Sequence, residues 1–317
     1  EGVTHVVLTG QIKPACIYTM WPDATARRLL AQLDRRNAHT IFGTVCRYVA
    51  SVGMEVLPST TFMEHCMPSE GHLAGPAPTP EQMDEARHGM ALAREIARLD
   101  IGQSLIVHGR EVVCVEGYKG TNECLRAGGG KPYPVTLCKV TKPGHDMRFD
   151  VPCIGLGTLR NCLKANVRHI VIEADRTIIF QREQVLALCN KHGITLHALA
   201  TPADGPKLDN PPDTEDDAAH ALFLAQQLER IGIGSSAVVC DGVVIAVEDP
   251  EGPLKCVHRA AAYMKRLRFA RLANWLCRFL LGAGSAPPVP MTLATTKPLP
   301  PDALHRARKA RMVVVGG

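Results

Sequence analysis

The chain has 317 residues, enough for about two domains, and 46% of them are hydrophobic against 21% charged. This composition supports a sizeable folded core and excludes a disordered chain. Aromatic residues make up only 4%, which argues against a protein that binds single-stranded nucleic acid by base stacking. No apolar run reaches the roughly 18–20 residues of a membrane span. Glu1 and Gly317 read as the edges of a fragment.

The net charge of +5 is unevenly distributed. Residues 253–317 carry 12 Lys/Arg and one acidic residue, Asp302, while the rest of the chain has 24 Lys/Arg against 30 Asp/Glu. A basic tail on a mildly acidic body favours an anionic partner, either nucleic acid or a lipid surface. The twelve cysteines include no C-x-x-C pair, so the spacing of a zinc site is absent. We therefore expect buried free thiols in a cytoplasmic protein.

The N-terminal part alternates between strand and helix patterns. The expected elements are a strand at 5–9 that ends at Gly10, helices at about 24–36 and 40–52, and a strand at 54–57. Such alternation predicts an α/β unit with a parallel sheet. Because so little of it is present, residues 1–78 are interpreted as the trailing part of such a domain.

The stretch Gly75-Pro-Ala-Pro-Thr-Pro80 is the clearest linker and leads into a helix. Thr79 is placed as the N-cap, Pro80 at the first helical position and Gln82 where it completes a capping box. This helix is expected to run to about Arg98. The elements predicted after it are strands at 104–108, 111–116, 135–140, 169–173, 177–180 and 194–198, with helices at 156–166 and 181–192. They predict a second α/β or α+β domain at 79–205.

An internal repeat follows at a constant offset of 132 residues. Fourteen positions are identical in the two copies, and they include Gly102 and Gly234, Ser104 and Ser236, and Glu116 and Glu248. We interpret residues 214–258 as a partial second copy of a helix and a hairpin. The alternative is two unrelated helix–hairpin units that share an apolar pattern.

Two stretches could carry chemistry. Between 139 and 155 the chain packs six charged or titratable residues into a segment broken by prolines and a glycine: Lys139, Lys142, His145, Asp146, Arg148 and Asp150. Lys and Arg suit phosphate oxygens, while Asp can hold a divalent cation or activate water. The second stretch, Glu116-Gly-Tyr-Lys-Gly-Thr-Asn122, places a carboxylate at a strand end before two glycines and a hydroxyl. An ordinary solvated loop is the alternative for each.

These stretches together resemble a known family. The residues that carry the resemblance are Gly10, Pro14, Pro22-Asp23, Leu99-Asp-Ile-Gly-Gln103, Val115-Glu116, Gly120-Thr121, Lys139, Lys142-Pro143, Asp146, Arg148, Asp150, Pro152, Ile154-Gly155, Glu173-Ala174 and Arg176. In this order they resemble the UDP-2,3-diacylglucosamine pyrophosphatase of the lipid A pathway. The resemblance covers about residues 1–200 and is specific over 99–176.

The resemblance implies a magnesium-dependent hydrolase that converts UDP-2,3-diacylglucosamine to UMP and 2,3-diacylglucosamine 1-phosphate by attack of water on the α-phosphorus. It implies catalytic roles for Asp150, Asp146 and Arg148. The Mg²⁺ ligands that it implies are Asp150, Glu116 and Asn122. The substrate-binding residues that it implies are Gly10, Gly102, Gln103, Gly120, Thr121, Lys139, Lys142 and Arg176.

The resemblance also implies an α/β fold in which a Rossmann-like nucleotide-binding domain precedes a catalytic and lipid-binding domain. We assign the trailing part of the first domain to 1–78 and the second domain to 79–205. A partial repeat of the second domain with a basic amphipathic helix is assigned to 206–285. Residues 286–317 are assigned to a linker and the start of a further domain.

The chain departs from the family at one motif and in length. It reads Lys119-Gly-Thr-Asn122 where the family reads E-G-T-D, and a glycine-rich N-terminal segment of the family is missing. An amide at Asn122 coordinates a cation more weakly than a carboxylate. A non-catalytic, lipid- or partner-binding member of the same fold is therefore the alternative function.

The segment Met264–Leu281 has the pattern of a basic amphipathic helix. Its apolar face comprises Phe269, Leu272, Leu276, Phe279 and Leu280, and Arg266, Arg271 and Arg278 lie toward the other side. One interpretation is a helix on the anionic inner membrane surface, which would make a cytoplasmic protein peripheral there. The other is an ordinary core helix. No nucleic-acid motif accompanies the basic residues, so we expect no nucleic-acid partner, and a homo-oligomer is left open.

Overall fold

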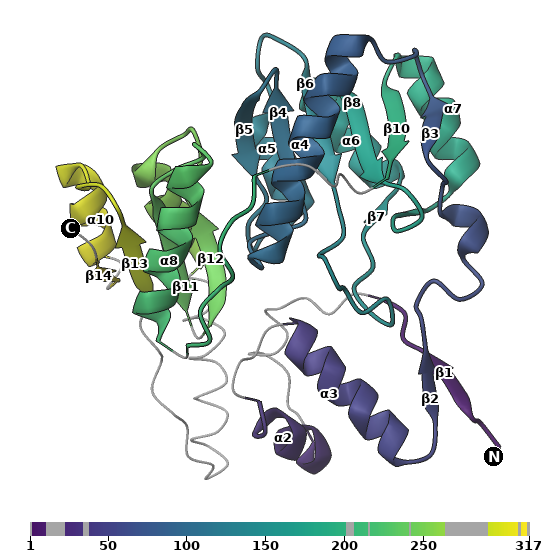
Figure 1. Ribbon diagram of the computed structural model, residues 1–317, viewed down its shortest axis with the longest axis horizontal. Helices are drawn as coiled ribbons and strands as arrows, with labels where there is room; N and C mark the ends of the chain where they lie inside the picture. The colour runs from purple at the N-terminus through teal and green to yellow at the C-terminus, as the bar shows by residue number, and fades with distance from the viewer. Residues whose placement is uncertain are drawn as a thin grey trace. The chain divides into compact units, whose positions relative to one another are not determined.

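The computed structural model describes residues 2–10, 23–33, 38–200, 206–214, 216–240, 242–263, 291–309 and 312–315. The chain divides into two compact units, one of Pro58–Asn210 and one that joins Glu1–Leu57 with Pro211–Gly317. Both units mix helices and strands, so the predicted α/β class is confirmed (Figure 1). No helix in the described ranges has the length and apolar character needed to span a bilayer.

The first segment contains two short strands with two helices between them. The elements are β1 (His5–Val7), α2 (Ala24–Leu30), α3 (Ala38–Ser51) and β2 (Glu55–Leu57). The backbone nitrogen of Ala26 donates to the Asp23 carboxylate at 2.7 Å, which caps the first turn of α2. β1 and β2 pair in parallel, as the alternating pattern predicts. The helix predicted at 24–36 ends at Leu30, and residues 34–37 lie outside the described residues.

The unit Pro58–Asn210 is built on a six-stranded sheet with the strand order β3-β10-β8-β6-β4-β5. Its strands are β3 (Gly71–Ala74), β4 (Ser104–His108), β5 (Glu111–Val115), β6 (Val135–Lys139), β8 (Val167–Glu173) and β10 (Thr195–Leu199). β6, β8 and β10 run parallel, while β4 and β3 run antiparallel to their neighbours. The carboxyl ends of β5, β6, β8 and β10 therefore share one edge, where ligand sites of α/β sheets form.

Helices cover both faces of this sheet (Figure 1). They are α4 (Pro80–Arg98), α5 (Thr121–Gly128), α6 (Leu156–Lys164) and α7 (Arg182–His192). A Cβ added to Gly89 of α4 would meet Val107 and Cys138, whereas one added to Gly128 of α5 would meet Ile106 and Cys114. Because neighbouring residues of a strand face opposite sides, α4 and α5 lie on opposite faces. Side chains of α6 and α7 share the core on the α5 face.

Helix α4 begins with the predicted capping box. The backbone nitrogen of Gln82 donates to the Thr79 hydroxyl at 3.2 Å, and that of Thr79 donates to the Gln82 side chain at 2.9 Å. Pro80 occupies the first turn, where its missing N–H costs nothing. The predicted start and the predicted end at Arg98 are both confirmed.

Two features upstream of α4 differ from the sequence prediction. β3 and a short 3₁₀ turn, η1 (Glu64–Cys66), were not expected, and β3 joins the sheet by pairing with β10. The unit therefore begins at Pro58, not at residue 79. Gly75 is a tight turn in this unit, with φ of 78° and the Ile194 carbonyl directly beside it, and not a linker between domains.

The segment Pro211–Gly317 forms a second, four-stranded sheet with the order β12-β11-β13-β14. Its elements are α8 (Asp217–Arg230), β11 (Ser236–Cys240), β12 (Val243–Val247), β13 (Thr292–Thr295), α10 (Pro301–Lys309) and β14 (Val313–Val315), and residues 253–263 are helical. β13 pairs with β11, so residues 292–315 complete this sheet. The assignment of 286–317 to a linker and a further domain is corrected accordingly, because strand pairing across about 50 residues leaves no local signal.

The hairpins of the two sheets share one register. Leu105 pairs with Val115 in the first hairpin, and Ala237 pairs with Val247 in the second, 132 positions later. In both hairpins the strand register shifts after the second residue pair. The next strand also matches, since Ser104 pairs with Lys139 and Ser236 with Thr295. The positions that are identical in sequence are therefore equivalent in strand geometry.

A buried histidine makes the stability of the Pro58–Asn210 unit depend on pH. His169 of β8 is 1% exposed, and neither ring nitrogen has a hydrogen-bond partner among the described residues. Burial, with smaller contributions from His197 and His72, lowers the pKa of His169 to about 4. Below an ordinary pKa of about 6.5 the unfolded chain binds a proton that the folded chain does not, so stability falls as the pH drops toward 4.

Replacing His169 with leucine should remove this dependence. At pH 5 the unfolded chain binds a proton at His169 that the folded protein does not, which lowers the free energy of unfolding by about 2 kcal/mol relative to pH 7.5. His169→Leu should therefore narrow the difference in unfolding free energy between these pH values by about 2 kcal/mol. Urea denaturation at both pH values measures it. The control is His192→Leu at an exposed position at the end of α7, which should keep the wild-type difference. Equal pH dependence in all three proteins would refute the prediction.

Candidate active site

Charged residues gather at the sheet edge formed by the carboxyl ends of the parallel strands. Glu116 directly follows β5, Lys139 is the last residue of β6, and Glu173 is the last residue of β8. β4 runs antiparallel to β6, so its first residue, Ser104, lies at the same edge. The topology thus brings together residues that are up to 69 positions apart in the sequence.

Lys139 is the centre of a polar network. Its side chain is almost fully buried, and the residue is 6% exposed. The ammonium group donates to the Thr121 hydroxyl at 2.9 Å and to the Ser104 hydroxyl at 3.2 Å. The Thr121 hydroxyl in turn donates to the Glu116 carboxylate at 3.0 Å. A buried ammonium group is thereby connected to a carboxylate through a single hydroxyl, which compensates the cost of burying the charge.

Two glycines shape the backbone around Glu116. A Cβ at Gly102 would lie 2.3 Å from the Glu116 carbonyl oxygen, so only glycine allows the two chains to approach so closely. Gly120 has φ of 79° and is the N-cap of α5, with the Glu116 carboxylate 3.8 Å from where its Cβ would be. Both were predicted to bind substrate, and in the structure both lie beside Glu116.

Asp150 belongs to the same group of charges. The residue is exposed at the surface, yet burial of its carboxyl group among neighbouring atoms raises the pKa of that group. His145 and Lys139 oppose this rise in pKa, while Glu116 adds to it. The residue also has φ of 52°, in the left-handed region that aspartate, like asparagine, adopts more readily than most side chains. A carboxyl group with a raised pKa that interacts with the charges of Lys139 and Glu116 is the arrangement expected of a catalytic group.

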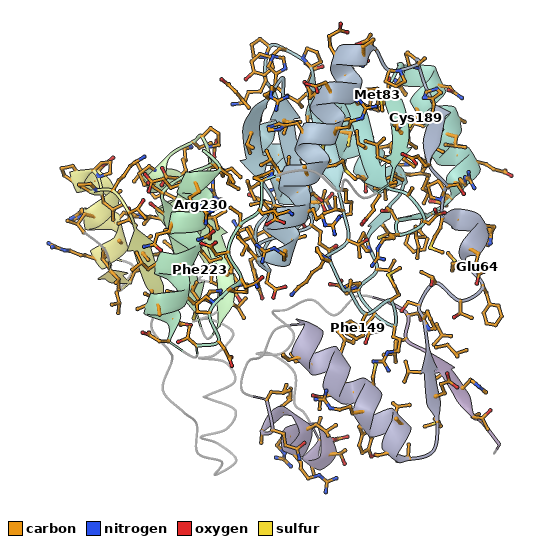
Figure 2. All side chains as sticks on the ribbon, viewed as in Figure 1. Glu64, Met83, Phe149, Cys189, Phe223 and Arg230 are labelled. Carbon is orange, nitrogen blue, oxygen red and sulfur yellow. The ribbon has the colours of Figure 1, made fainter. Side chains whose placement is uncertain are left out.

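The loop that carries Asp150 is held in place by hydrogen bonds. The backbone nitrogen of Ser59 donates to the Met147 carbonyl at 2.8 Å, and its hydroxyl donates to the Arg148 carbonyl at 2.7 Å. A ring nitrogen of His145 lies 2.8 Å from the carbonyl oxygen of Phe149, whose buried side chain is labelled in Figure 2. The loop is therefore an ordered part of the unit.

Four predicted residues have charged partners of their own. Asp146 and Arg148 pair with each other at 2.6 Å, so the two groups neutralise one another. Lys142 pairs with Asp100 at 2.5 Å. Arg176 lies 3.9 Å from the buried Glu173, which also accepts from the backbone nitrogen of Thr141 at 2.7 Å. Their predicted roles at phosphate or metal stay predictions.

Three further predicted residues lie differently from expectation. The side-chain oxygen of Asn122 accepts from Asn161 of α6 at 2.8 Å. Gln103 contributes its backbone, since its carbonyl accepts from Val140 at 2.9 Å. Gly10, with φ of 101°, belongs to the other unit.

Two of the three predicted Mg²⁺ ligands suit a hard divalent cation. Glu116 and Asp150 supply carboxylate oxygens, the ligands that Mg²⁺ prefers, and Glu116 raises the pKa of Asp150 as a neighbouring negative charge does. The third predicted ligand, Asn122, already uses its oxygen with Asn161. Among the residues that the structure describes, no cluster of three or more His, Cys, Asp or Glu side chains is arranged to hold a metal ion.

Sequence reasoning assigned no role to three residues at this edge, although His145 was named as part of the charged stretch. Ser104 contacts Lys139, His145 faces Asp150 electrostatically, and the exposed Cys153 lies within the electrostatic influence of Lys139 and Asp150. A signal for Ser104 existed, because it is one of the positions repeated 132 residues later. His145 was visible only as one charged residue of the loop, and Cys153, which lies in the short strand β7 (Cys153–Ile154), gave no signal.

Comparison with known proteins decides the family. A model described as the LpxI C-terminal domain matches residues 69–197 and 206–274, and a model described as the LpxI N-terminal domain matches residues 1–66. The chain belongs to the LpxI family. The resemblance inferred from the sequence is thereby confirmed. One curated relative, the UDP-2,3-diacylglucosamine pyrophosphatase LpxI of Caulobacter vibrioides, is 29% identical over 206 residues, which cover 61% of this chain and 74% of the relative.

The LpxI matches correspond to the parts of the structure. The Glu116–Lys139–Asp150 group lies within the first stretch matched by the LpxI C-terminal domain, at 69–197. The second stretch, 206–274, begins before α8 and includes the repeated hairpin. Gly10 falls within the match to the LpxI N-terminal domain.

Proposed function

We propose that this protein hydrolyses UDP-2,3-diacylglucosamine to UMP and 2,3-diacylglucosamine 1-phosphate in lipid A biosynthesis. The observation that carries the proposal is the group of Asp150, Glu116 and Lys139 at the sheet edge of a chain that belongs to the LpxI family. The curated relative bears the name of this activity. Cleavage of a phosphoric anhydride needs positive charge on the phosphate oxygens and a group that orients water, and the site has both.

Each residue has a role that follows from its position. Lys139 lies at the sheet edge, where its ammonium group suits a phosphate oxygen of the substrate. Asp150 is open to solvent and has a raised pKa, which suits a carboxylate that orients water and accepts its proton. Glu116 and Asp150 would hold Mg²⁺. The cation would supply charge neutralisation at the phosphates.

Product analysis tests the reaction. The purified full chain, incubated with UDP-2,3-diacylglucosamine and followed by ³¹P NMR, should yield UMP and the lipid phosphate in equal amounts. The predicted attack at the α-phosphorus places ¹⁸O from labelled water in UMP, whereas attack at the β-phosphorus would place it in the lipid phosphate. The proposed function would be refuted if prolonged incubation released neither UMP nor the lipid phosphate.

The alternative is a member that binds this lipid without turnover. It is favoured by the Asn122–Asn161 hydrogen bond and by the pairing of Lys119 with Glu123 at 3.9 Å, both at the motif where the chain departs from the family. It predicts saturable binding of UDP-2,3-diacylglucosamine with no UMP release.

We infer that the second sheet is a catalytically silent copy of the first. Thr295 stands where Lys139 stands in the strand pairing, and Pro253 stands 132 positions after Thr121. The Asp150 loop has no counterpart, because β13 leads to α10 within five residues. This sheet therefore lacks counterparts of Lys139 and Asp150, two of the three groups to which we assign the chemistry.

We infer that Met264–Leu281, a segment outside the described residues, associates with the membrane surface. Each Lys or Arg near an anionic surface contributes about 1 kcal/mol, and the substrate's acyl chains would place the protein at the inner membrane surface. Flotation with vesicles that contain anionic lipid should recover the protein at low salt and lose it at high salt. The variant with Arg266, Arg271 and Arg278 all changed to Glu should remain unbound. Flotation that is insensitive to salt and to these changes would favour the core-helix interpretation.

A further inference from the structure

We propose that Ser104 is a positioning residue that holds the ammonium group of Lys139 in place beside Glu116 and Asp150. Its contribution to hydrolysis rests on the proposed function, but its effect on Lys139 does not. Ser104 is fully buried, at 0% exposure, as the first residue of β4. Lys139 is its direct partner in the pairing of β4 with β6. A serine at this position places its hydroxyl oxygen 3.2 Å from the ammonium nitrogen of Lys139.

The hydrogen-bond directions in the network are fixed by chemistry. Lys139 can only donate, and Glu116 as a carboxylate can only accept. The Thr121 hydroxyl donates its one proton to Glu116, so at 3.3 Å from Ser104 it must accept from that serine. Ser104 therefore accepts from Lys139 and donates to Thr121. Every proton in the network points from the lysine toward the carboxylate.

This arrangement leaves one donor of Lys139 for another partner. Two of the three N–H groups of the ammonium are directed at Ser104 and Thr121. Two fixed acceptors determine the direction of the third N–H, whereas one acceptor would leave the ammonium free to rotate about a single contact. The ammonium group lies against Thr121, which is itself hydrogen-bonded to Glu116, and its charge also acts on Asp150. Ser104 thus orients the free donor.

The second sheet provides an internal comparison. Its equivalent serine, Ser236, is also 0% exposed, and its carbonyl accepts from the backbone nitrogen of Glu248 at 2.8 Å. The carbonyl of Ser104 accepts from Glu116 in the same way at 2.9 Å. The glycine is kept as well, since a Cβ at Gly234 would lie 2.6 Å from the Glu248 carbonyl oxygen. The backbone frame is therefore the same in both sheets.

The hydroxyls of the two serines differ. The Ser236 hydroxyl has no hydrogen-bond partner among the described residues. Its two partners in the first sheet would be Lys139 and Thr121, and the second sheet has Thr295 and Pro253 at those positions. The backbone frame alone therefore gives the serine hydroxyl nothing to bind. In the first sheet its purpose is the contact with Lys139 and Thr121.

The test compares Ser104→Ala with Ser236→Ala, which remove the same atom from equivalent strand positions. Limiting acetic anhydride and mass spectrometry report how fast Lys139 reacts, with the exposed Lys164 of α6 as the internal reference. We expect Ser104→Ala to raise the relative rate of Lys139 acetylation about fivefold and to lower kcat about tenfold with KM within about twofold, as loss of one hydrogen bond to a charged group predicts. Ser236→Ala should match wild type in all three measurements.

Further outcomes keep the inference separate from the proposed function. If the Ser104→Ala protein does not fold, Ser104→Cys, which is close in size and a poor hydrogen-bond partner, should give the same changes. Unchanged acetylation and kcat in a folded Ser104 variant would overturn the inference. Equal changes in both serine variants would overturn it too, by indicating a general effect of the strand. If wild type releases no UMP, the proposed function fails, and the acetylation rates still decide the role of Ser104.

Discussion

Asp150→Asn is expected to lower kcat for UMP release by about 10³-fold or more, because it removes the carboxylate that orients and deprotonates water. The change preserves size, and asparagine tolerates the left-handed backbone at φ of 52° as well as aspartate does. Asparagine is therefore the informative substitution. Steady-state release of UMP measures the effect, and circular dichroism and thermal unfolding report the fold.

The matched control is Asp175→Asn. Asp175 is also an aspartate with positive φ, at 54°, and its side chain is exposed. It lies outside the predicted site, so this variant should keep kcat within about twofold. A folded Asp150→Asn protein with near wild-type turnover would show that the site has been assigned to the wrong residue.

Glu116→Gln is expected to lower kcat by about 10²-fold. Glutamine can still accept the hydrogen bond from Thr121, but it lacks the negative charge that balances Lys139 and that would hold a divalent cation. The variant should also need a higher magnesium concentration for half-maximal rate. Titration of magnesium against the rate of UMP release measures both effects.

The second sheet supplies the control for this substitution. Glu248 occupies the equivalent position, and its carboxylate accepts from both the backbone nitrogen and the hydroxyl of Ser235 at 3.1 Å. Glu248→Gln should leave kcat and the magnesium dependence within about twofold of wild type. If the two variants lose activity equally, the second sheet is not silent.

Local patterns predicted the elements that local interactions form. The capping box at Thr79 and Gln82 and the neighbouring strands predicted at 104–108 and 111–116 depend on residues within a few positions of each other, and both are present. Helix α5 was missed because it starts at Gly120 with no side-chain cap, so its first turn resembled a ligand-binding loop. β3 was missed because its partner β10 lies about 120 residues away, and only the folded sheet defines its pairing.

The candidate site was predicted in part for the same reason. Lys139 and Glu116 could be named because charged residues at strand ends are visible in a sequence, and Asp150 because it lies in a densely charged loop and in the stretch that resembles the family. Their connection could not be, since the hydroxyls of Ser104 and Thr121 come from the start of a strand and the start of an unexpected helix. The partners of Lys142 and Asn122, about 40 residues away in the chain, were likewise decided by the fold.

The repeat shows what the sequence could and could not predict about the C-terminal part. Identities 132 positions apart predicted the hairpin at β11 and β12, and its register agrees with the first hairpin. β13 and β14 share no such identities with their counterparts, so they were assigned to a separate domain. Their place in the sheet depends on backbone pairing, which many apolar sequences satisfy.

The most direct measurement is steady-state UMP release from UDP-2,3-diacylglucosamine by the purified full chain, with magnesium and with excess EDTA, beside equilibrium binding of the same substrate. Magnesium-dependent release that saturates with substrate, and that is lost in EDTA, is the predicted result. Saturable binding with no release of UMP under either condition would contradict it and would identify a lipid-binding member of the family instead.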